Sequence, residues 1–334
     1  MIIVRAPMRI PIGGGGTDLP SYYSQFEGEW ISAALNKYTY VVVNKTFDQK
    51  IKLKYSKSEE VDDVSQIEHP IFRECLKLLG INGGVEIVSI ADMPSNTGLG
   101  TSSSFTVALL TALHTFLRNE KKKDIPTRQE IAEQACHVAM DILKEPSGKQ
   151  DEYAAAFGGL NVFHADKEGN VKVSPFFPIH INFGSLEELN HNLLMFYTGI
   201  RRESRDALSI QQNATQSGDQ DMINNLHRVK EIGKEIRLAL ENNDFNKFGQ
   251  LMDLHWQEKI KRKGTSDPQI NQWYELAKQN GALGGKLMGA GGGGFFLFYV
   301  PENKDNFRKA MSQAGLQEIF FNIDLDGVKV ISDV

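Results

Sequence analysis

Residues 94–104 combine glycines with hydroxyl side chains immediately before an apolar segment. The run contains Pro94, Asn96, Thr97, Gly98, Leu99, Gly100, Thr101, Ser102, Ser103 and Ser104. Residues 85–91 alternate like a half-buried strand and residues 105–117 are apolar enough for a buried helix, so the run joins a strand to a helix. The first turn of a helix has unpaired N–H groups and a partial positive charge, which favour a bound anion. The hydroxyls suit phosphate oxygens or Mg²⁺, and a plain helix cap is the alternative interpretation.

Familiar nucleotide-binding motifs do not account for this run. The sequence has no G-x-x-x-x-G-K-[ST] P-loop, and it lacks the H-R-D and D-F-G signatures of protein kinases. A G-x-G-x-x-G pattern begins at Gly289, but the apolar residues 295–300 after it predict a strand where a Rossmann site requires a helix. Support for a phosphate site must therefore come from other segments.

Two more glycine-rich segments and one carboxylate provide that support. Residues 13–16 are four consecutive glycines, which are costly to order and indicate close approach of a ligand. Arg9 and Asp18 flank them; they suit an anion and sugar hydroxyls respectively, and a salt bridge is the alternative. Residues 284–294 could surround an anion with N–H groups, support another loop or form a tight turn. Asp151 begins a helical turn of small residues, which keeps its carboxylate ionised and suited to act as a general base.

Composition and charge exclude several function classes. The 334 residues are 41% hydrophobic and 24% charged, with a net charge of −5 and dispersed basic residues, so nucleic acid is not an expected partner. No apolar stretch approaches the ~20 residues of a membrane span, and no signal peptide is evident, so we expect no membrane partner and a cytoplasmic location. Cys75 and Cys136 are expected to be reduced core thiols, and no histidine spacing indicates a metal site.

The order of predicted elements indicates two α+β domains. Strands are predicted at 2–6, 30–45, 50–55 and 85–91, helices at 64–79, 105–117 and 128–143, and a hairpin over 158–177. After a buried strand at 193–197 come helices at 206–216, 221–241, 245–261, 270–279 and 305–314, with strands at 294–300, 318–322 and 328–331. We therefore expect an N-terminal domain over residues 1–185 and a C-terminal domain over residues 186–334.

Taken together, the three glycine segments resemble those of the GHMP kinase superfamily, named for galactokinase, homoserine kinase, mevalonate kinase and phosphomevalonate kinase. The motifs span residues 7–18, 94–104 and 286–294, in the family's order, and the resemblance covers essentially the whole chain. It implies a two-domain α+β fold with ATP and substrate bound in the cleft between the domains. The C-terminal domain would contain a helical segment and a ferredoxin-like sheet that carries the third motif.

The resemblance also implies roles for individual residues. ATP would be bound by Pro94, Asn96, Gly98, Leu99, Gly100, Thr101, Ser102 and Ser103. Asp151 matches the family's catalytic aspartate, and Arg9 matches the arginine that some members place beside it. Mg²⁺ would lie near Ser103 or Ser104. Many members carry a second acidic ligand before the aspartate, and Asp141 is the nearest carboxylate to that position because residues 138–140 contain none.

Within the superfamily, the first motif and residues 146–159 are most similar to the D-glycero-D-manno-heptose 7-phosphate kinases, which phosphorylate the sugar's anomeric hydroxyl. Gly15 and Gly16 stand where galactokinases carry Glu-His, which disfavours galactose. The expected substrate-binding residues are Gly14, Gly15, Gly16, Thr17, Asp18, Lys149, Arg201, Arg202, Gly291 and Gly292. Arginine suits a phosphate group, so some of Arg201, Arg202 and Arg205 are candidates for the 7-phosphate, with a solvated charge cluster as the alternative. Lys149 and Arg9 are further candidates.

Two other functions stay open at this point. L-fucose kinases share the glycine-rich first motif, so an unphosphorylated sugar is the alternative substrate. The missing acid at residues 138–140 leaves room for a non-catalytic binding protein of the same fold. The expected partners are ATP, Mg²⁺ and a small sugar phosphate, and a homodimer is the assembly to be tested.

Overall fold

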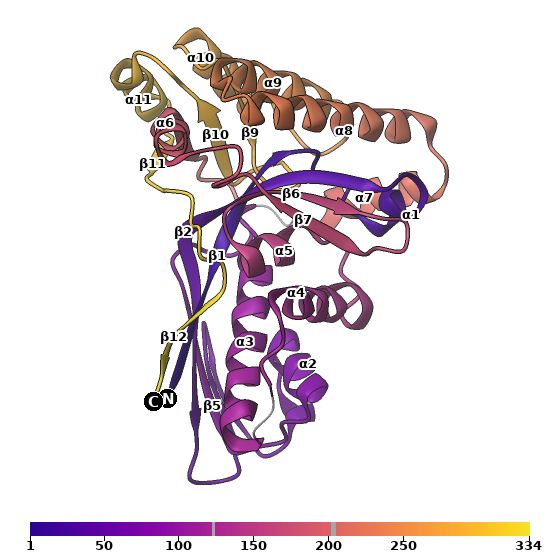
Figure 1. The fold of residues 1–334 in the computed structure, drawn as a ribbon, viewed down its shortest axis with the longest axis vertical. Helices are drawn as coiled ribbons and strands as arrows, with labels where there is room; N and C mark the ends of the chain where they lie inside the picture. The colour runs from indigo at the N-terminus through magenta and orange to yellow at the C-terminus, as the bar shows by residue number, and fades with distance from the viewer. Residues whose placement is uncertain (122–123, 202–204) are drawn as a thin grey trace.

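Two long strands form the centre of the larger of two sheets (Figure 1). The structure is a computed structural model and describes residues 1–121, 124–201 and 205–334. β1 (Ile2–Gly13) and β2 (Gly28–Lys45) pair antiparallel, with Ile2 opposite Val43 and Gly13 opposite Ile31. The eight-stranded sheet has the order β12-β1-β2-β5-β3-β4, and β6 and β7 extend from β2. These strands are β3 (Ile51–Lys54), β4 (Ser58–Val61), β5 (Val85–Ala91), β6 (Leu160–Ala165), β7 (Val171–Pro175) and β12 (Lys329–Asp333).

Helices cover one face of this sheet (Figure 1). They are α2 (Pro70–Leu79), α3 (Thr101–Lys121), α4 (Arg128–Cys136) and α5 (Gln150–Phe157), and a 3₁₀ turn (Val64–Gln66) precedes α2. α3 is apolar around most of its circumference because it packs between the sheet and the other three helices. The helix expected over 128–143 is present, but it changes type: α4 ends at Cys136 and a π-helix (His137–Ile142) continues it.

A second, four-stranded antiparallel sheet has the order β11-β8-β10-β9. Its strands are β8 (Leu193–Tyr197), β9 (Gly284–Leu287), β10 (Phe295–Tyr299) and β11 (Gln317–Ile319). The helices of this region are α6 (Phe183–Asn192), α7 (Arg205–Gln216), α8 (Gln220–Glu241), α9 (Phe245–Lys259), α10 (Pro268–Gln279) and α11 (Lys304–Gln313). Every residue of β10 is buried, which explains its continuous aromatic and aliphatic sequence. The remaining helix, α1 (Pro20–Phe26), follows β1 and packs on α7.

The last strand lies in the first sheet. β12 pairs antiparallel with β1, so that Ile2 lies opposite Asp333, and the two ends of the chain are neighbours in Figure 1. The α+β class predicted from sequence is confirmed, and residues 329–333, which the sequence assigned to the second domain, form a strand of the first sheet. The boundary near residue 185 stays a prediction. Among the described residues, no helix combines the length and the apolar character that crossing a bilayer requires.

Candidate active site

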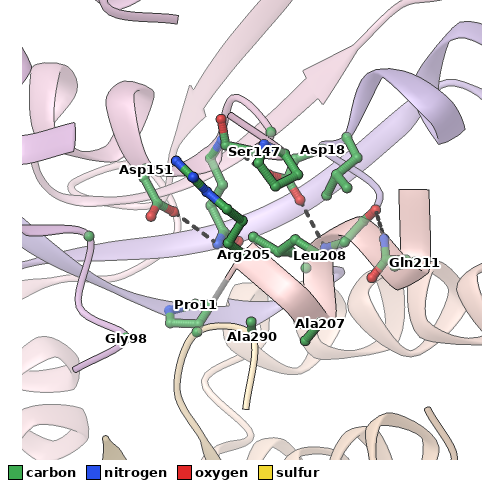
Figure 2. Close-up of a pocket in the computed structure, with 18 of the residues that line it drawn as sticks. Pro11, Asp18, Gly98, Ser147, Asp151, Arg205, Ala207, Leu208, Gln211 and Ala290 are labelled. Carbon is green, nitrogen blue, oxygen red and sulfur yellow. Dashed lines mark hydrogen bonds between the residues drawn. The ribbon is translucent and has the colours of Figure 1, made fainter. Parts of the chain in front are cut away.

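A cavity of about 390 Å³ lies where the first sheet, the loop before α3 and the helices α5, α7 and α9 meet. Its walls contain residues of all three glycine segments, which are far apart in the sequence. In Figure 2, Gly98 and Asp151 lie on one side of the cavity, and Asp18 and Gln211 lie on the other. Four groups of residues determine the chemistry of the cavity: an arginine–carboxylate pair, the glycine segments, a serine–glutamate pair and a set of basic residues.

The first group is an arginine paired with a carboxylate. Arg9 on β1 is buried, and it donates from Nε to Oδ1 of Asp151 at 2.6 Å and from Nη2 to Oδ2 at 2.5 Å. Its Nη1 donates to the carbonyl oxygen of Gly98 at 2.5 Å. Asp151 lies in the first turn of α5, where the helix dipole adds to the arginine's stabilisation of the negative charge. The carboxylate is therefore held in a fixed orientation against the glycine loop.

The glycine loop itself lies at the N-terminus of α3. Gly98 and Gly100 have φ values of +82° and +73°, which only glycine adopts at little cost, and Gly100 approaches the Asp151 carboxylate closely. Of the predicted ATP-binding residues, six line the cavity: Asn96, Gly98, Gly100, Thr101, Ser102 and Ser103.

Pro94 and Leu99 do not line it. The Pro94 carbonyl accepts a hydrogen bond from Thr97 at 2.9 Å, and Leu99 lies in the hydrophobic core while its carbonyl accepts the Arg9 N–H. Leu99 is directed away from the cavity because an apolar side chain gains from burial in the core, whereas Pro94 is exposed and shapes the loop through its carbonyl.

The third glycine segment supports this loop by backbone contact. A Cβ on Gly289 would lie 2.7 Å from the Cα of Gly98, and one on Gly294 would lie 2.2 Å from the carbonyl oxygen of Thr97. Gly291 and Gly292, predicted to bind substrate, do not line the cavity; they pack against the backbone of Thr265 instead. These glycines are present because two loops touch without side chains between them.

The first glycine segment is divided in the same way. Gly15, Gly16 and Asp18 line the cavity, whereas Gly14 packs on the backbone of Glu29 and Thr17 is buried. The Thr17 hydroxyl lies 2.8 Å from two carbonyl oxygens, so Thr17 fixes the turn and does not face a ligand. Burial, with a smaller contribution from the Asp151 charge, raises the pKa of Asp18 above its ordinary value.

A serine and a glutamate form the group best suited to a metal ion. The Ser103 hydroxyl donates to Oε1 of Glu152 at 2.8 Å, and Oε2 of Glu152 is buried without a hydrogen-bond partner. Both residues line the cavity. Burial, followed by the charge of Asp151, raises the pKa of Glu152 to about 8.

The structure does not place Ser104 or Asp141 at this site. The Ser104 hydroxyl is buried and donates to the carbonyl of Ala6. The Asp141 side chain is 64% exposed, pairs with His137 and does not line the cavity. The metal roles predicted for these two residues are therefore wrong, because a one-residue change of position on a helix turns the side chain by ~100°.

Two predicted phosphate-binding cations also lie elsewhere. Lys149 is buried and donates to both carboxylate oxygens of Glu133 and to the Gly169 carbonyl, away from the cavity. Arg201 is exposed and does not line the cavity, and Arg202 lies outside the described residues. For Lys149 and Arg201 the predicted substrate contact is wrong; the lysine already has a buried partner, and the arginine faces solvent.

Sequence reasoning missed the cations that do line the cavity. They are Lys259, Arg262, Lys263 and Lys286, together with His255; Arg205, a member of the predicted arginine cluster, also lines the cavity. The basic residues at 259–263 are a sequence signal for this set. The sequence does not indicate which of them face the cavity, because most of the run lies beyond the end of α9. Lys286 lies inside the third glycine segment, where the glycines on both sides indicate a backbone role for the whole segment.

Comparison with known proteins identifies the family. The GHMP kinases N terminal domain matches residues 70–159 and the GHMP kinases C terminal domain matches residues 236–317, together just over half of the chain. The chain is a GHMP kinase. Both matched regions contribute to the cavity, the first through the α3 loop and the second through α9 and β9. A GHMP kinase uses ATP and transfers a phosphoryl group to an alcohol group, so this protein is a phosphotransferase.

Relatives cover the whole chain. This GHMP kinase is 29% identical over 354 residues to the D-glycero-alpha-D-manno-heptose 7-phosphate kinase of Campylobacter jejuni, covering 98% of each chain. A crystal structure of a sugar kinase from Campylobacter jejuni superposes with a TM-score of 0.76 at 26% identity, covering 98% of this chain and 97% of that one. A D-glycero-D-manno-heptose 1-phosphate kinase from Bacteroides thetaiotaomicron has a TM-score of 0.80 at 23% identity and covers 100% of both chains, which shows the shared fold.

Proposed function

We propose that this GHMP kinase transfers the γ-phosphoryl group of ATP to the anomeric C1 hydroxyl of D-glycero-D-manno-heptose 7-phosphate, giving the 1,7-bisphosphate and ADP. The observation that supports the reaction is the Arg9–Asp151 pair, which faces the glycine loop of α3 within one cavity. The similarity along the whole chain to the Campylobacter jejuni heptose kinase supports the sugar.

In the proposed reaction, the hydroxyl oxygen attacks the γ-phosphorus while the bond to the bridging oxygen of ADP breaks. Asp151 accepts the hydroxyl proton, and Arg9 holds both carboxylate oxygens in place. Each terminal nitrogen of a guanidinium carries two N–H groups, so Nη1 and Nη2 of Arg9 each keep one for a phosphate oxygen. The first turn of α3 presents backbone N–H groups to the nucleotide phosphates. Phosphoryl transfer needs chiefly this positioning and charge neutralisation.

Ser103 and Glu152 fit a magnesium ion. A hydroxyl and a carboxylate are hard oxygen ligands, and the unpartnered Oε2 of Glu152 requires a partner in its buried position. The described residues contain no cluster of three or more acidic, histidine or cysteine ligands, which suits an ion bound by one carboxylate and by nucleotide phosphates. When bound, Mg²⁺ would neutralise charge on those phosphates.

Replacing Glu152 by glutamine (Glu152→Gln) is expected to weaken the Mg²⁺ dependence of ADP binding by about tenfold. Because the pKa of Glu152 is raised to about 8 without metal, Mg²⁺ must displace a proton, so the wild-type affinity should increase as the pH rises from 6 to 9. The variant should lose this pH dependence. Isothermal titration with ADP across a Mg²⁺ series measures both effects.

Asp141→Asn is the matched control, because its carboxylate is exposed and lies outside the cavity. We expect it to leave the Mg²⁺ dependence unchanged. Equal behaviour of the two variants would refute the assignment of Glu152.

A kinase screen tests the proposed substrate. ADP release would be followed with heptose 7-phosphate, unphosphorylated heptose, L-fucose and galactose, and NMR would identify the phosphorylated hydroxyl. We expect turnover of the 7-phosphate at C1 with kcat/KM at least about 10²-fold above the free sugars, because a phosphate group offers charge-assisted hydrogen bonds. Preference for L-fucose would replace the proposal with the alternative sugar, and no turnover of any sugar would support a binding protein.

A further inference from the structure

One wall of the cavity consists of basic side chains that form no ion pair within 4 Å among the described residues. It is formed by Lys286 on β9, His255 and Lys259 on α9, and Arg262 just after that helix. Lys286 and His255 are each only 2% exposed, and Lys259 is 7% exposed. We call these four residues the cationic wall.

Every side-chain hydrogen bond that the cationic wall makes within the described chain goes to a neutral oxygen. Lys259 donates to the carbonyls of Leu287 and Gly289 at 2.7 and 2.6 Å. Arg262 donates to the side-chain oxygens of Asn225 at 2.6 Å and Gln211 at 3.0 Å. The charges of Asp18 and Glu258 act on Arg262, but no described carboxylate forms an ion pair with the wall. A buried charge without a paired opposite charge is unfavourable, so the wall suits an anion that is not part of the protein.

Three of these side chains have donors to spare. Lys286 makes only one long hydrogen bond, 3.4 Å to the Ile12 carbonyl. Nη2 of Arg262 and both ring nitrogens of His255 are buried without a hydrogen-bond partner in the part of the chain that the structure describes. Lys259, in contrast, has its ammonium group fixed by two carbonyls and contributes mainly charge.

The pKa values of these groups also reflect the unfavourable burial of positive charge. Burial, followed by repulsion from Arg262 and Arg9, lowers the pKa of Lys286 to about 7. Burial and neighbouring cations also lower the pKa of His255 and of Lys259 well below their ordinary values. A bound anion would reverse these effects for each group.

The Arg262 end of the wall lies away from the nucleotide loop, whereas Lys286 and Lys259 are near enough to Arg9 for its charge to lower their pKa values. Arg262 lies beside the first glycine segment: a Cβ on Gly16 would be 3.0 Å from its Nη1 and 3.1 Å from the Gln211 amide nitrogen. Gln211 lies on the side of the cavity opposite Gly98 (Figure 2). The nucleotide phosphates already have the α3 N-terminus, whereas Asp18, near Arg262, suits sugar hydroxyls.

We propose that Lys286, Arg262 and His255 bind a phosphate group that the acceptor sugar already carries before the reaction. The inference rests on the proposed function and gives it a structural cause: the wall selects a sugar phosphate over a free sugar. It replaces Arg201 and Lys149, which lie outside the cavity.

Lys286→Met tests the proposal, because methionine keeps most of the lysine's length without its charge. We expect the KM for heptose 7-phosphate to increase about 10- to 100-fold while the KM for ATP changes less than about twofold. The melting temperature should stay level or rise, since a desolvated cation is removed. Arg262→Gln should act in the same direction, and Arg201→Gln, at an exposed arginine, should change neither KM.

Binding of inorganic phosphate separates this proposal from the proposed function. Calorimetry would be done with the protein saturated by Mg²⁺ and the non-hydrolysable analogue β,γ-imido-ATP, which fills the γ-phosphate position. Phosphate should bind to the wild type and lose at least about tenfold in affinity in Lys286→Met. That result would uphold the anion site even if the substrate screen named another phosphorylated acceptor. A rise in the KM for ATP alone, or equal phosphate binding by the variant, would overturn it.

Discussion

Asp151→Asn is expected to lower kcat by about 10³-fold, within the usual 10²- to 10⁴-fold range for loss of a general base. Asparagine has almost the same shape, but it cannot accept the hydroxyl proton as a carboxylate does. Its amide N–H₂ would also face Arg9, which now donates to both carboxylate oxygens. Steady-state ADP release with saturating ATP and sugar phosphate measures the effect.

Two comparisons locate the cause of that loss. The same substitution at the exposed Asp141 should leave kcat unchanged within about twofold, since surface changes away from special features have small effects. Binding of β,γ-imido-ATP to Asp151→Asn should persist, because the α3 loop supplies the phosphate contacts. If Asp151→Asn turned over at the wild-type rate, the base would have to be another group.

Gly294→Ala is expected to have the second largest effect, through the shape of the nucleotide loop. Gly294 has φ of +96°, and an added Cβ would lie 2.2 Å from the Thr97 carbonyl oxygen. The Thr97 backbone must move, and with it Gly98, whose carbonyl accepts a hydrogen bond from Arg9. We expect a loss of about 3 kcal/mol or more in stability, from strain and overpacking, and a KM for ATP raised at least tenfold.

Gly315→Ala provides the matched control for this change. Gly315 also has a positive φ, +87°, but nothing lies within 4 Å of its added Cβ. It should cost about 1 kcal/mol from backbone conformation alone and leave the KM for ATP unchanged. Thermal unfolding and ATP titration of the two variants distinguish the effect of backbone strain from that of the Gly294–Thr97 contact. Equal losses of stability and equal changes in the KM for ATP would contradict the role of that contact.

The sequence predicted those parts of the fold that depend on local pattern. Alternation over 85–91 and continuous apolar residues at 193–197 and 295–299 gave strands that the structure contains. The hairpin over 158–177 is present as β6 and β7, and the long helices α8 and α9 follow their apolar periodicity. The glycine segments could be recognised because backbone contact requires glycine whatever surrounds it.

Side-chain direction and long-range pairing could not be predicted in this way. Asp141 follows the change from α-helix to π-helix at His137, which no apolar period reveals. Lys149 pairs with Glu133 on another helix, and Lys286 meets Arg262 only after the second sheet has folded against α9. Glu152 directly follows Asp151, but only the structure places it against Ser103. Such contacts depend on tertiary packing, which local residue spacing does not encode.

The pairing of β12 with β1 constrains how this protein is made. During translation, β1 leaves the ribosome long before β12, and the edge of β1 that β12 covers lacks its partner until residue 333 has been added. The segment between them, including the entire second sheet, must be synthesised in the meantime. Domains that are continuous in sequence can fold one after another as they emerge. Here the sheet that supports Arg9 is complete only after residue 333 has been synthesised, so a shorter nascent chain does not carry a finished catalytic half.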